Sequence, residues 1–176
     1  TTWSSAHREA SIIVGVTRNG AREVHAFRSP DAQLVPVPTE STIYEIGSVS
    51  KIYLATILAE LERRGVLSIE DPISKWLPNG DRLKPEIGAL TIRQLATHSS
   101  GLPSMGKRHS EIAASETMGQ WQPPYGAYTH YLRYKKEHLY AHWEDAEFVY
   151  PTGEGWLYCV MGMGTVGHIL ELATGQ

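Results

Sequence analysis

Hydrophobic residues near the start of the chain fall into two short stretches, residues 11–17 and 21–28, separated by Asn19-Gly20. Asn-Gly tolerates positive φ angles and therefore favours the two-residue turn of a β-hairpin. The pattern predicts two paired strands. The polar passage from Ser29 to Thr42 contains three prolines, which lack a backbone donor, and it is predicted to be a loop.

Between Ser48 and Arg64 the hydrophobic positions change to helical spacing. Gly65 follows at the place where a helix commonly ends in a left-handed residue. The pattern predicts a half-buried helix, and the apolar residues with this spacing are Ile52, Ala55, Ile57, Leu58 and Leu61.

Two shorter helices are predicted next. Asp71-Pro72 begins a helical turn that ends before Pro78. Thr91 and Gln94 have the spacing of a capping box, which predicts a helix running to about Thr97.

The region 104–150 has a different composition, because it holds six of the nine tyrosines. Four of them recur every three positions, which predicts a helical insertion with an aromatic face. Packing of these rings in the core is a simpler explanation of this face than the wall of a substrate cleft. Beyond it, an apolar stripe ended by Thr174-Gly175 predicts a last helix. The tyrosines are Tyr125, Tyr128, Tyr131 and Tyr134, and the stripe is Val166, Ile169, Leu170 and Ala173.

Charge and composition exclude several classes of protein. The chain has 176 residues, 41% of them hydrophobic, and 16 basic against 19 acidic side chains give a net charge of −3. No basic field is available to hold nucleic acid. No stretch approaches the ~18 consecutive apolar residues of a membrane span. The single cysteine, Cys159, excludes an intrachain disulfide framework and leaves the compartment open.

A sheet of two strands is only marginally stable in water, and it is too small to cover the apolar sides of this many amphipathic helices. The sequence therefore predicts an incomplete sheet whose other strands come from elsewhere.

Ser48 and Lys51 carry the strongest chemical signal. They are three residues apart, so a helix places the hydroxyl and the amine on one side of its first turn. An amine beside a hydroxyl can accept its proton and make it a nucleophile, and the helix start offers an amide donor to an oxyanion. Ser104 and Lys107 have the same spacing but lie in a Gly/Pro-rich stretch without helical periodicity, so no fixed geometry is expected there.

Three segments, Tyr44–Lys51, Leu67–Ile73 and Leu90–Pro103, resemble the penicillin-recognising serine hydrolases in order and spacing. The resemblance is to the class C β-lactamase and D-Ala-D-Ala carboxypeptidase family, which includes esterases, D-aminopeptidases and transacylases. It implies an α/β (α+β) fold of the β-lactamase/transpeptidase type, with an antiparallel sheet flanked by helices and a helical subdomain.

The resemblance also implies a Tyr-x-Asn element, and residues 151–162 occupy its place. Tyr158 matches, whereas Val160 stands where the family has Asn. A phenol beside Lys51 can have a lowered pKa and exchange protons with Ser48, but the residues leave open whether Lys51 or Tyr158 is the base.

The family's third element, Lys or His followed by Thr or Ser and Gly, is absent from these residues. The chain therefore corresponds to the N-terminal part of one β-lactamase-like domain, lacking the C-terminal strands. Its expected parts are a hairpin and loop (1–47), the helices from the Ser48 helix onward (48–103), the helical insertion (104–150) and the tyrosine element with the last helix (151–176).

The resemblance implies a serine hydrolase that cleaves or transfers an acyl group through a Ser48 acyl-enzyme, without metal or organic cofactor. The substrate would be a β-lactam, a D-amino-acid peptide or an ester. Val160, at the substrate-binding position, favours an esterase, an aminopeptidase or a transacylase. The missing half, as a second chain or fragment, is the expected protein partner, and these residues alone should be a poor catalyst. The alternative is a binding or regulatory relative without catalysis.

Other side chains have simpler explanations. His138 and His142 near Glu144 have metal-ligand spacing on a helix, but two partly buried imidazoles are the simpler interpretation. His98 is interpreted as a hydrogen-bonding residue at a helix end, and Cys159 as a small buried thiol.

Overall fold

The computed structural model describes residues 11–28, 37–39, 41–106 and 134–176. The chain divides into two compact units, Thr1–Gly47 and Ser48–Gln176, and each is described by itself.

The first unit contains the predicted hairpin. Strands β1 (Ser11–Arg18) and β2 (Ala21–Arg28) pair antiparallel, and the register places Arg18 opposite Ala21 at the turn. The φ angles of Asn19 and Gly20 are 50° and 82°, as the primed turn between two strands requires. The hairpin prediction is confirmed. Most of the predicted loop lies outside the described residues, since only 37–39, 41 and 42 are described, and these form neither helix nor strand.

The second unit is helical in its described part. Its elements, in chain order, are η1 (Gly47–Val49, which crosses the unit boundary), α2 (Ser50–Arg63), α3 (Ile73–Trp76), η2 (Gly80–Arg82), α4 (Pro85–Gly88), α5 (Ile92–Ala96), α8 (Lys136–Glu144) and α9 (Val160–Thr174). None of the described helices is long and apolar enough to cross a bilayer.

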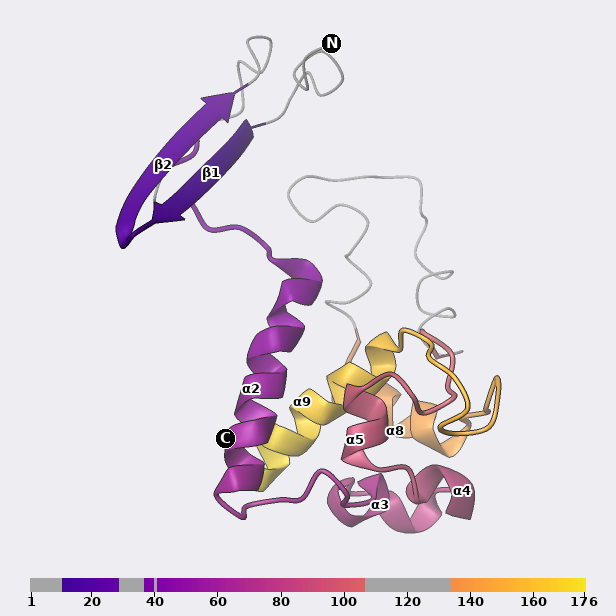
Figure 1. Ribbon diagram of the computed structural model, residues 1–176. Coiled ribbons are helices and arrows are strands. Elements are labelled where there is room, and N and C mark those ends of the chain that lie inside the picture. The colour runs from indigo at the N-terminus through magenta and orange to yellow at the C-terminus, as the bar shows by residue number, and fades with distance from the viewer. Residues whose placement is uncertain (1–10, 29–36, 40, 107–133) are drawn as a thin grey trace, which may run out of the picture. The chain divides into compact units, whose positions relative to one another are not determined.

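Helix α9 lies at the centre of this unit. It contacts α2, α3 and α5, and Figure 1 shows it beside α2 and behind α5. Val166 and Ile169 on the predicted apolar stripe are fully buried, and α9 ends at Gly175 in the left-handed conformation. The last-helix prediction is confirmed at its end, but the helix begins earlier, at Val160. The other fully buried large side chains around α9 include Ile73, Ile92, Leu95, Leu102 and Trp143.

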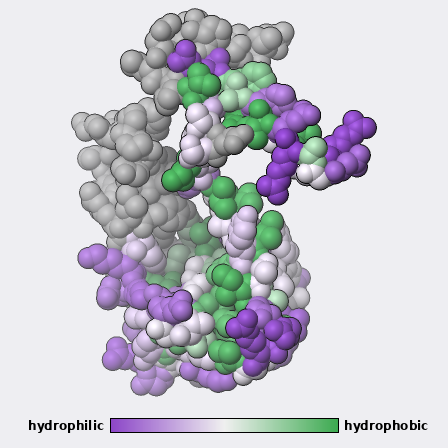
Figure 2. Space-filling view, turned by 90° about the vertical axis from the view of Figure 1, so that its left-hand side faces the viewer, coloured by the Kyte–Doolittle hydropathy of each residue, from purple (hydrophilic) through white to green (hydrophobic). Residues whose placement is uncertain are grey.

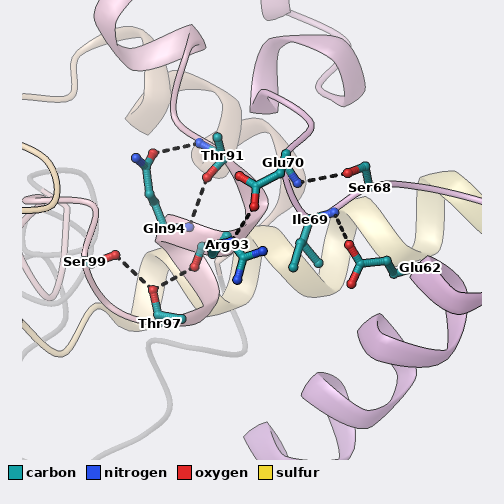
Figure 3. Close-up of polar contacts among 9 residues, drawn as sticks. All are labelled: Glu62, Ser68, Ile69, Glu70, Thr91, Arg93, Gln94, Thr97 and Ser99. Atoms are coloured by element: carbon teal, nitrogen blue, oxygen red, sulfur yellow. Dashed lines mark hydrogen bonds and ion pairs between the residues drawn. The ribbon is translucent and has the colours of Figure 1, made fainter.

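Helix α5 is fixed at its start by the predicted capping box. The backbone amide of Gln94 donates to the Thr91 hydroxyl over 3.2 Å, and the Thr91 amide donates to the Gln94 side-chain oxygen over 2.9 Å (Figure 3). Arg93 pairs with Glu70 on its outer side. Because α5 is only five residues long, these bonds at its start determine the direction in which the chain leaves it.

Two helix predictions need correction. Ser48 lies in the 3-10 turn η1, so the regular helix begins at Ser50. Helix α2 is half-buried as predicted, with Leu58 and Leu61 in the core, but Ile52 and Ile57 lie on its exposed side, where they are 67% and 51% exposed. Figure 2, seen from the side of α2, shows hydrophobic side chains along this face. Periodicity reports which side of a helix is apolar, not whether a partner covers it.

The tyrosine-rich region is described only in part. Tyr125, Tyr128 and Tyr131 lie outside the described residues. Tyr134 precedes α8, so it does not share that helix's face, and its ring is partly buried against the core. A helix does occur in the predicted insertion, as α8.

Candidate active site

The structure brings the three side chains of the sequence prediction together. The hydroxyls of Ser48 and Tyr158 are 2.6 Å apart, and Lys51 Nζ donates to Ser48 Oγ over 3.2 Å. Lys51 Nζ also lies 5.2 Å from the centre of the Tyr158 ring. Ser48 Oγ is therefore in contact with an amine on one side and a phenol on the other, and each is within reach of its proton.

Local structure explains this meeting. The turn η1 leads directly into α2, so Ser48 and Lys51, three residues apart, project on the same side. Tyr158 is 110 residues away in sequence and comes from the extended segment before α9. The first pair follows from helix geometry alone, whereas the third residue depends on tertiary structure.

The charge of Lys51 acts on the phenol. Hydrogen bonding from Lys51, followed by that from Ser48, holds the pKa of Tyr158 below its usual value, and partial burial opposes this only weakly. The phenolate form is therefore stabilised beside the serine hydroxyl.

A template of backbone carbonyls holds the segment that carries Tyr158. Four consecutive residues after α5 each accept a hydrogen bond from the stretch 149–157, and Ser104 accepts at the start of α9. The chain leaving α5 thus positions the chain entering α9. The pairs are His98 O with Leu157 N, Ser99 O with Gly153 N, Ser100 O with Thr152 Oγ1, Gly101 O with Val149 N, and Ser104 O with Val160 N.

His98 and Cys159 behave as predicted from the sequence. The Cys159 amide donates to His98 Nδ1 over 3.1 Å, which makes His98 a hydrogen-bonding residue after a helix end. The Cys159 thiol is fully buried, and burial raises its pKa, which disfavours the thiolate that a nucleophile requires. Its sulfur instead accepts from the Gly162 amide and caps α9.

Val160 lines two grooves on α9. One, of about 350 Å³, also contains Lys51 and Leu54, and the other, of about 540 Å³, contains Leu139 and His168. Val160 and Lys51 thus line one groove, to which Val160 contributes an apolar side chain.

The remaining candidates stay apart from this site. Among the described residues no three His, Cys, Asp or Glu side chains are arranged to hold a metal ion. His138 Nδ1 accepts from the Lys135 amide, and His142 is buried, which lowers its pKa to about 4 and keeps it neutral. Ser104 uses its carbonyl at the start of α9, and its partner in the second Ser-x-x-Lys match, Lys107, lies outside the described residues.

Sequence reasoning missed two features of the site. The carbonyl template leaves no side-chain pattern, because backbone atoms make nearly all its bonds. The cap of α9 was missed because its N-cap residue is Cys159, whereas Ser, Thr, Asp and Asn are the usual signals.

The comparisons with known proteins agree with this geometry. The family model described as Beta-lactamase matches residues 4–176. The chain belongs to the β-lactamase family.

Three similar proteins illustrate the range of this family. The chain is 26% identical to a β-lactamase of Pseudomonas fluorescens over 95% of its own length and 40% of that protein. It is 26% identical to Esterase EstB of Burkholderia gladioli, over 78% of the chain and 34% of the esterase. The solved structure of the octameric penicillin-binding protein homologue from Pyrococcus abyssi matches 97% of the chain and 36% of that protein, with 26% identity and a TM-score of 0.72.

These matches confirm the predicted family and the β-lactamase/transpeptidase fold. The chain spans about two fifths or less of the length of these relatives.

Proposed function

We propose that this chain carries the nucleophile and the proton-transfer groups of a serine hydrolase that acts on acyl compounds. One observation carries the proposal: Ser48 Oγ is 2.6 Å from a phenol whose pKa is lowered and 3.2 Å from a lysine amine. A hydroxyl needs an adjacent base to become a nucleophile at neutral pH, and both candidate bases are in contact with it.

In the proposed reaction the Tyr158 phenolate takes the proton of Ser48 while Oγ bonds to the substrate's carbonyl carbon. The carbonyl oxygen becomes an oxyanion. When the intermediate collapses, the bond to the leaving group breaks, and the leaving group takes the proton from Tyr158. Water then repeats the sequence and releases the acid. Lys51 stabilises the phenolate and donates to Oγ throughout.

The proposed substrate is an ester or amide with an apolar group near its acyl carbon. Val160 supports this, because its side chain offers no hydrogen bond to an amide carbonyl of the substrate and it lines a groove next to Lys51. β-Lactams and D-amino-acid peptides belong to the same reaction class, but they would lose the contact that an Asn provides. We therefore expect a short-chain nitrophenyl ester to be turned over faster than a penicillin.

The proposal is tested by covalent labelling in the complete protein. A penicillin, whose ring opens without losing a fragment, is expected to add its whole mass at Ser48, and a fluorophosphonate its mass less hydrogen fluoride. Ser48→Ala is expected to abolish either adduct. Ser104→Ala is the matched control, since Ser104 has the same spacing to a lysine and is expected to leave labelling unchanged. Intact mass spectrometry followed by peptide mapping measures both.

Absence of any adduct with the unsubstituted protein would instead favour a binding or regulatory relative. Labelling that survives Ser48→Ala would contradict the assignment of the nucleophile.

We further propose that another polypeptide segment, continuous with this chain or separate, covers the exposed apolar side of α2. Ile52, Tyr53 and Ile57 are 67%, 64% and 51% exposed, and unpartnered apolar faces of this kind mark interfaces. The complete protein is therefore the proper sample for measuring activity.

A further inference from the structure

The residues before and after Tyr158 are both bonded to one residue. The Leu157 amide donates to the backbone carbonyl of His98 over 3.0 Å, and the Cys159 amide donates to Nδ1 of its imidazole over 3.1 Å. The imidazole also lies against the phenol, with ring centres 4.6 Å apart. His98 thus holds the amides of both neighbours of Tyr158 and lies against its ring.

His98 has an unusual backbone for this role. Its φ is 59°, in the left-handed region, directly after α5 ends. The corresponding position after α2 is Gly65, which adopts this conformation without a steric cost. A side chain with a Cβ is disfavoured here, and such local strain is found where a side chain has a function.

The protonation state of the imidazole suits the hydrogen bond. Burial, followed by the positive charge of Lys51, holds the pKa of His98 below its usual value, so the ring is neutral at neutral pH. A neutral ring with an acceptor at Nδ1 carries its proton on Nε2. The titratable groups that face it are Lys51 from α2, and Tyr158 and Cys159 from the segment before α9.

We propose that His98 is a positioning residue for Tyr158: its neutral imidazole, acting as an acceptor for the Cys159 amide, holds the phenol at hydrogen-bond distance from Ser48. This inference rests on the proposed function, because it assigns the phenol a part in proton transfer. His98 itself does not touch the reacting atoms. A proton on Nδ1 would remove the acceptor, so acid is expected to release the Tyr158 segment on this side.

Two substitutions distinguish the contribution of the His98 side chain from that of its backbone conformation. His98→Gly adopts the left-handed conformation readily but removes the acceptor. His98→Asn also tolerates positive φ and offers a side-chain oxygen close to the place of Nδ1. Both keep the backbone carbonyl that accepts from Leu157.

Two measurements are made on the complete protein and both variants. The first is the rate of Ser48 labelling by a fluorophosphonate. We expect His98→Gly to slow it by about 10- to 100-fold, as for a catalytic group displaced by about 1 Å, and His98→Asn to recover most of the rate.

The second measurement is hydrogen exchange at two amides. In His98→Gly the Cys159 amide is expected to exchange faster, whereas the Leu157 amide stays protected because its acceptor is retained. In the unsubstituted protein the Cys159 amide is expected to lose protection as the pH falls through the pKa of His98, and in His98→Asn it is expected not to. Faster exchange of both amides in His98→Gly would indicate local unfolding and contradict a role for the side chain.

The inference is overturned if His98→Gly labels at the unsubstituted rate, or if the Cys159 amide stays protected in it. If the unsubstituted protein takes no label at all, the proposed function fails, and the exchange of the Cys159 amide still decides whether the imidazole holds this segment.

Discussion

The pKa of the Tyr158 phenol is subject to opposing effects. Lys51 and then Ser48 lower its pKa by hydrogen bonding, while partial burial raises it. The lowering prevails because the ammonium is a full charge, whereas the phenol is only partly removed from water. The sequence left open which residue is the base. The pKa of the Tyr158 hydroxyl can be measured to address this question.

Lys51→Gln is expected to raise the pKa of Tyr158, because it removes the largest cause of the lowering. The ultraviolet absorbance of the phenolate, with Tyr158→Phe as the reference, measures this even if the variant has no activity. A phenolate base acts above its pKa, so any remaining labelling by a fluorophosphonate should begin to rise at higher pH than in the unsubstituted protein.

Lys75→Gln is the control, since Lys75 pairs with Asp71 outside the site. An unchanged Tyr158 titration in Lys51→Gln would show that Lys51 does not set the phenol's ionisation.

Single residues differ in how far the sequence predicts their surroundings. Ser48 and Lys51 were predictable as a contact, because three residues along a helix fix their mutual direction. Tyr158 was found only through resemblance to a family, since 110 residues of chain separate it from Ser48 and no local rule spans that distance. That His98 bonds the Cys159 amide was also beyond the sequence, which showed only a polar residue near a helix end.

Helix α5 illustrates how a short element supports the site. The capping box lies at its start and Arg93 pairs with Glu70 (Figure 3). The chain that leaves its end carries His98 and the carbonyl template. A helix of five residues has little stability of its own, so most of the stabilisation of α5 comes from its caps and its packing. The capping box was predictable because it is a local pattern of two side chains.

Thr91→Ala is expected to destabilise the protein by about 1 kcal/mol, because it removes the acceptor for the Gln94 amide. The midpoint of urea denaturation measures this change. Thr174→Ala is the matched control: Thr174 is exposed at the end of α9 and its hydroxyl donates to the Leu170 carbonyl of its own helix, so a change within about 0.5 kcal/mol is expected. Equal losses in both variants would mean that the box has no special part in stability.

The beginning of α9 shows the limit of prediction for an element. The apolar stripe identified its second half, because those residues face the core. Its first turn is held by the Cys159 sulfur and the Ser104 carbonyl, which are tertiary or unusual caps that periodicity does not detect.

The apolar face of α2 concerns the protein's assembly. The sequence predicted that the sheet in these residues is too small for the helices, and the described part of the chain contains two strands, paired in the first unit. The core around α9 includes Leu58 and Leu61 of α2, whereas Ile52 and Ile57 are exposed. The helix therefore has one side in this core and one side available to the proposed further segment.

Ile57→Ala separates these two sides. In the complete protein, where we propose that Ile57 is covered, it is expected to cost about 2 kcal/mol or more. In residues 1–176 alone Ile57 is 51% exposed, and the change is expected to stay within about 0.5 kcal/mol. Chemical denaturation of both samples provides the comparison.

Leu58→Ala is the companion variant. Leu58 is buried against the core around α9, so a loss of about 2 kcal/mol or more is expected in both samples. If Ile57→Ala is as mild in the complete protein as in the shorter chain, nothing covers this face of α2.

The carbonyl template also affects how readily this protein can be altered. A loop registered mainly by main-chain atoms is largely indifferent to the identity of its side chains, so the other positions of the stretch 149–157 are open to randomisation without misplacing the phenol. The exceptions are Thr152, which bonds through its hydroxyl, Gly153, whose φ is 84°, and Trp156, which packs against Tyr158. Libraries built at the remaining positions would vary the segment that leads to the phenol while the reactive groups keep their alignment.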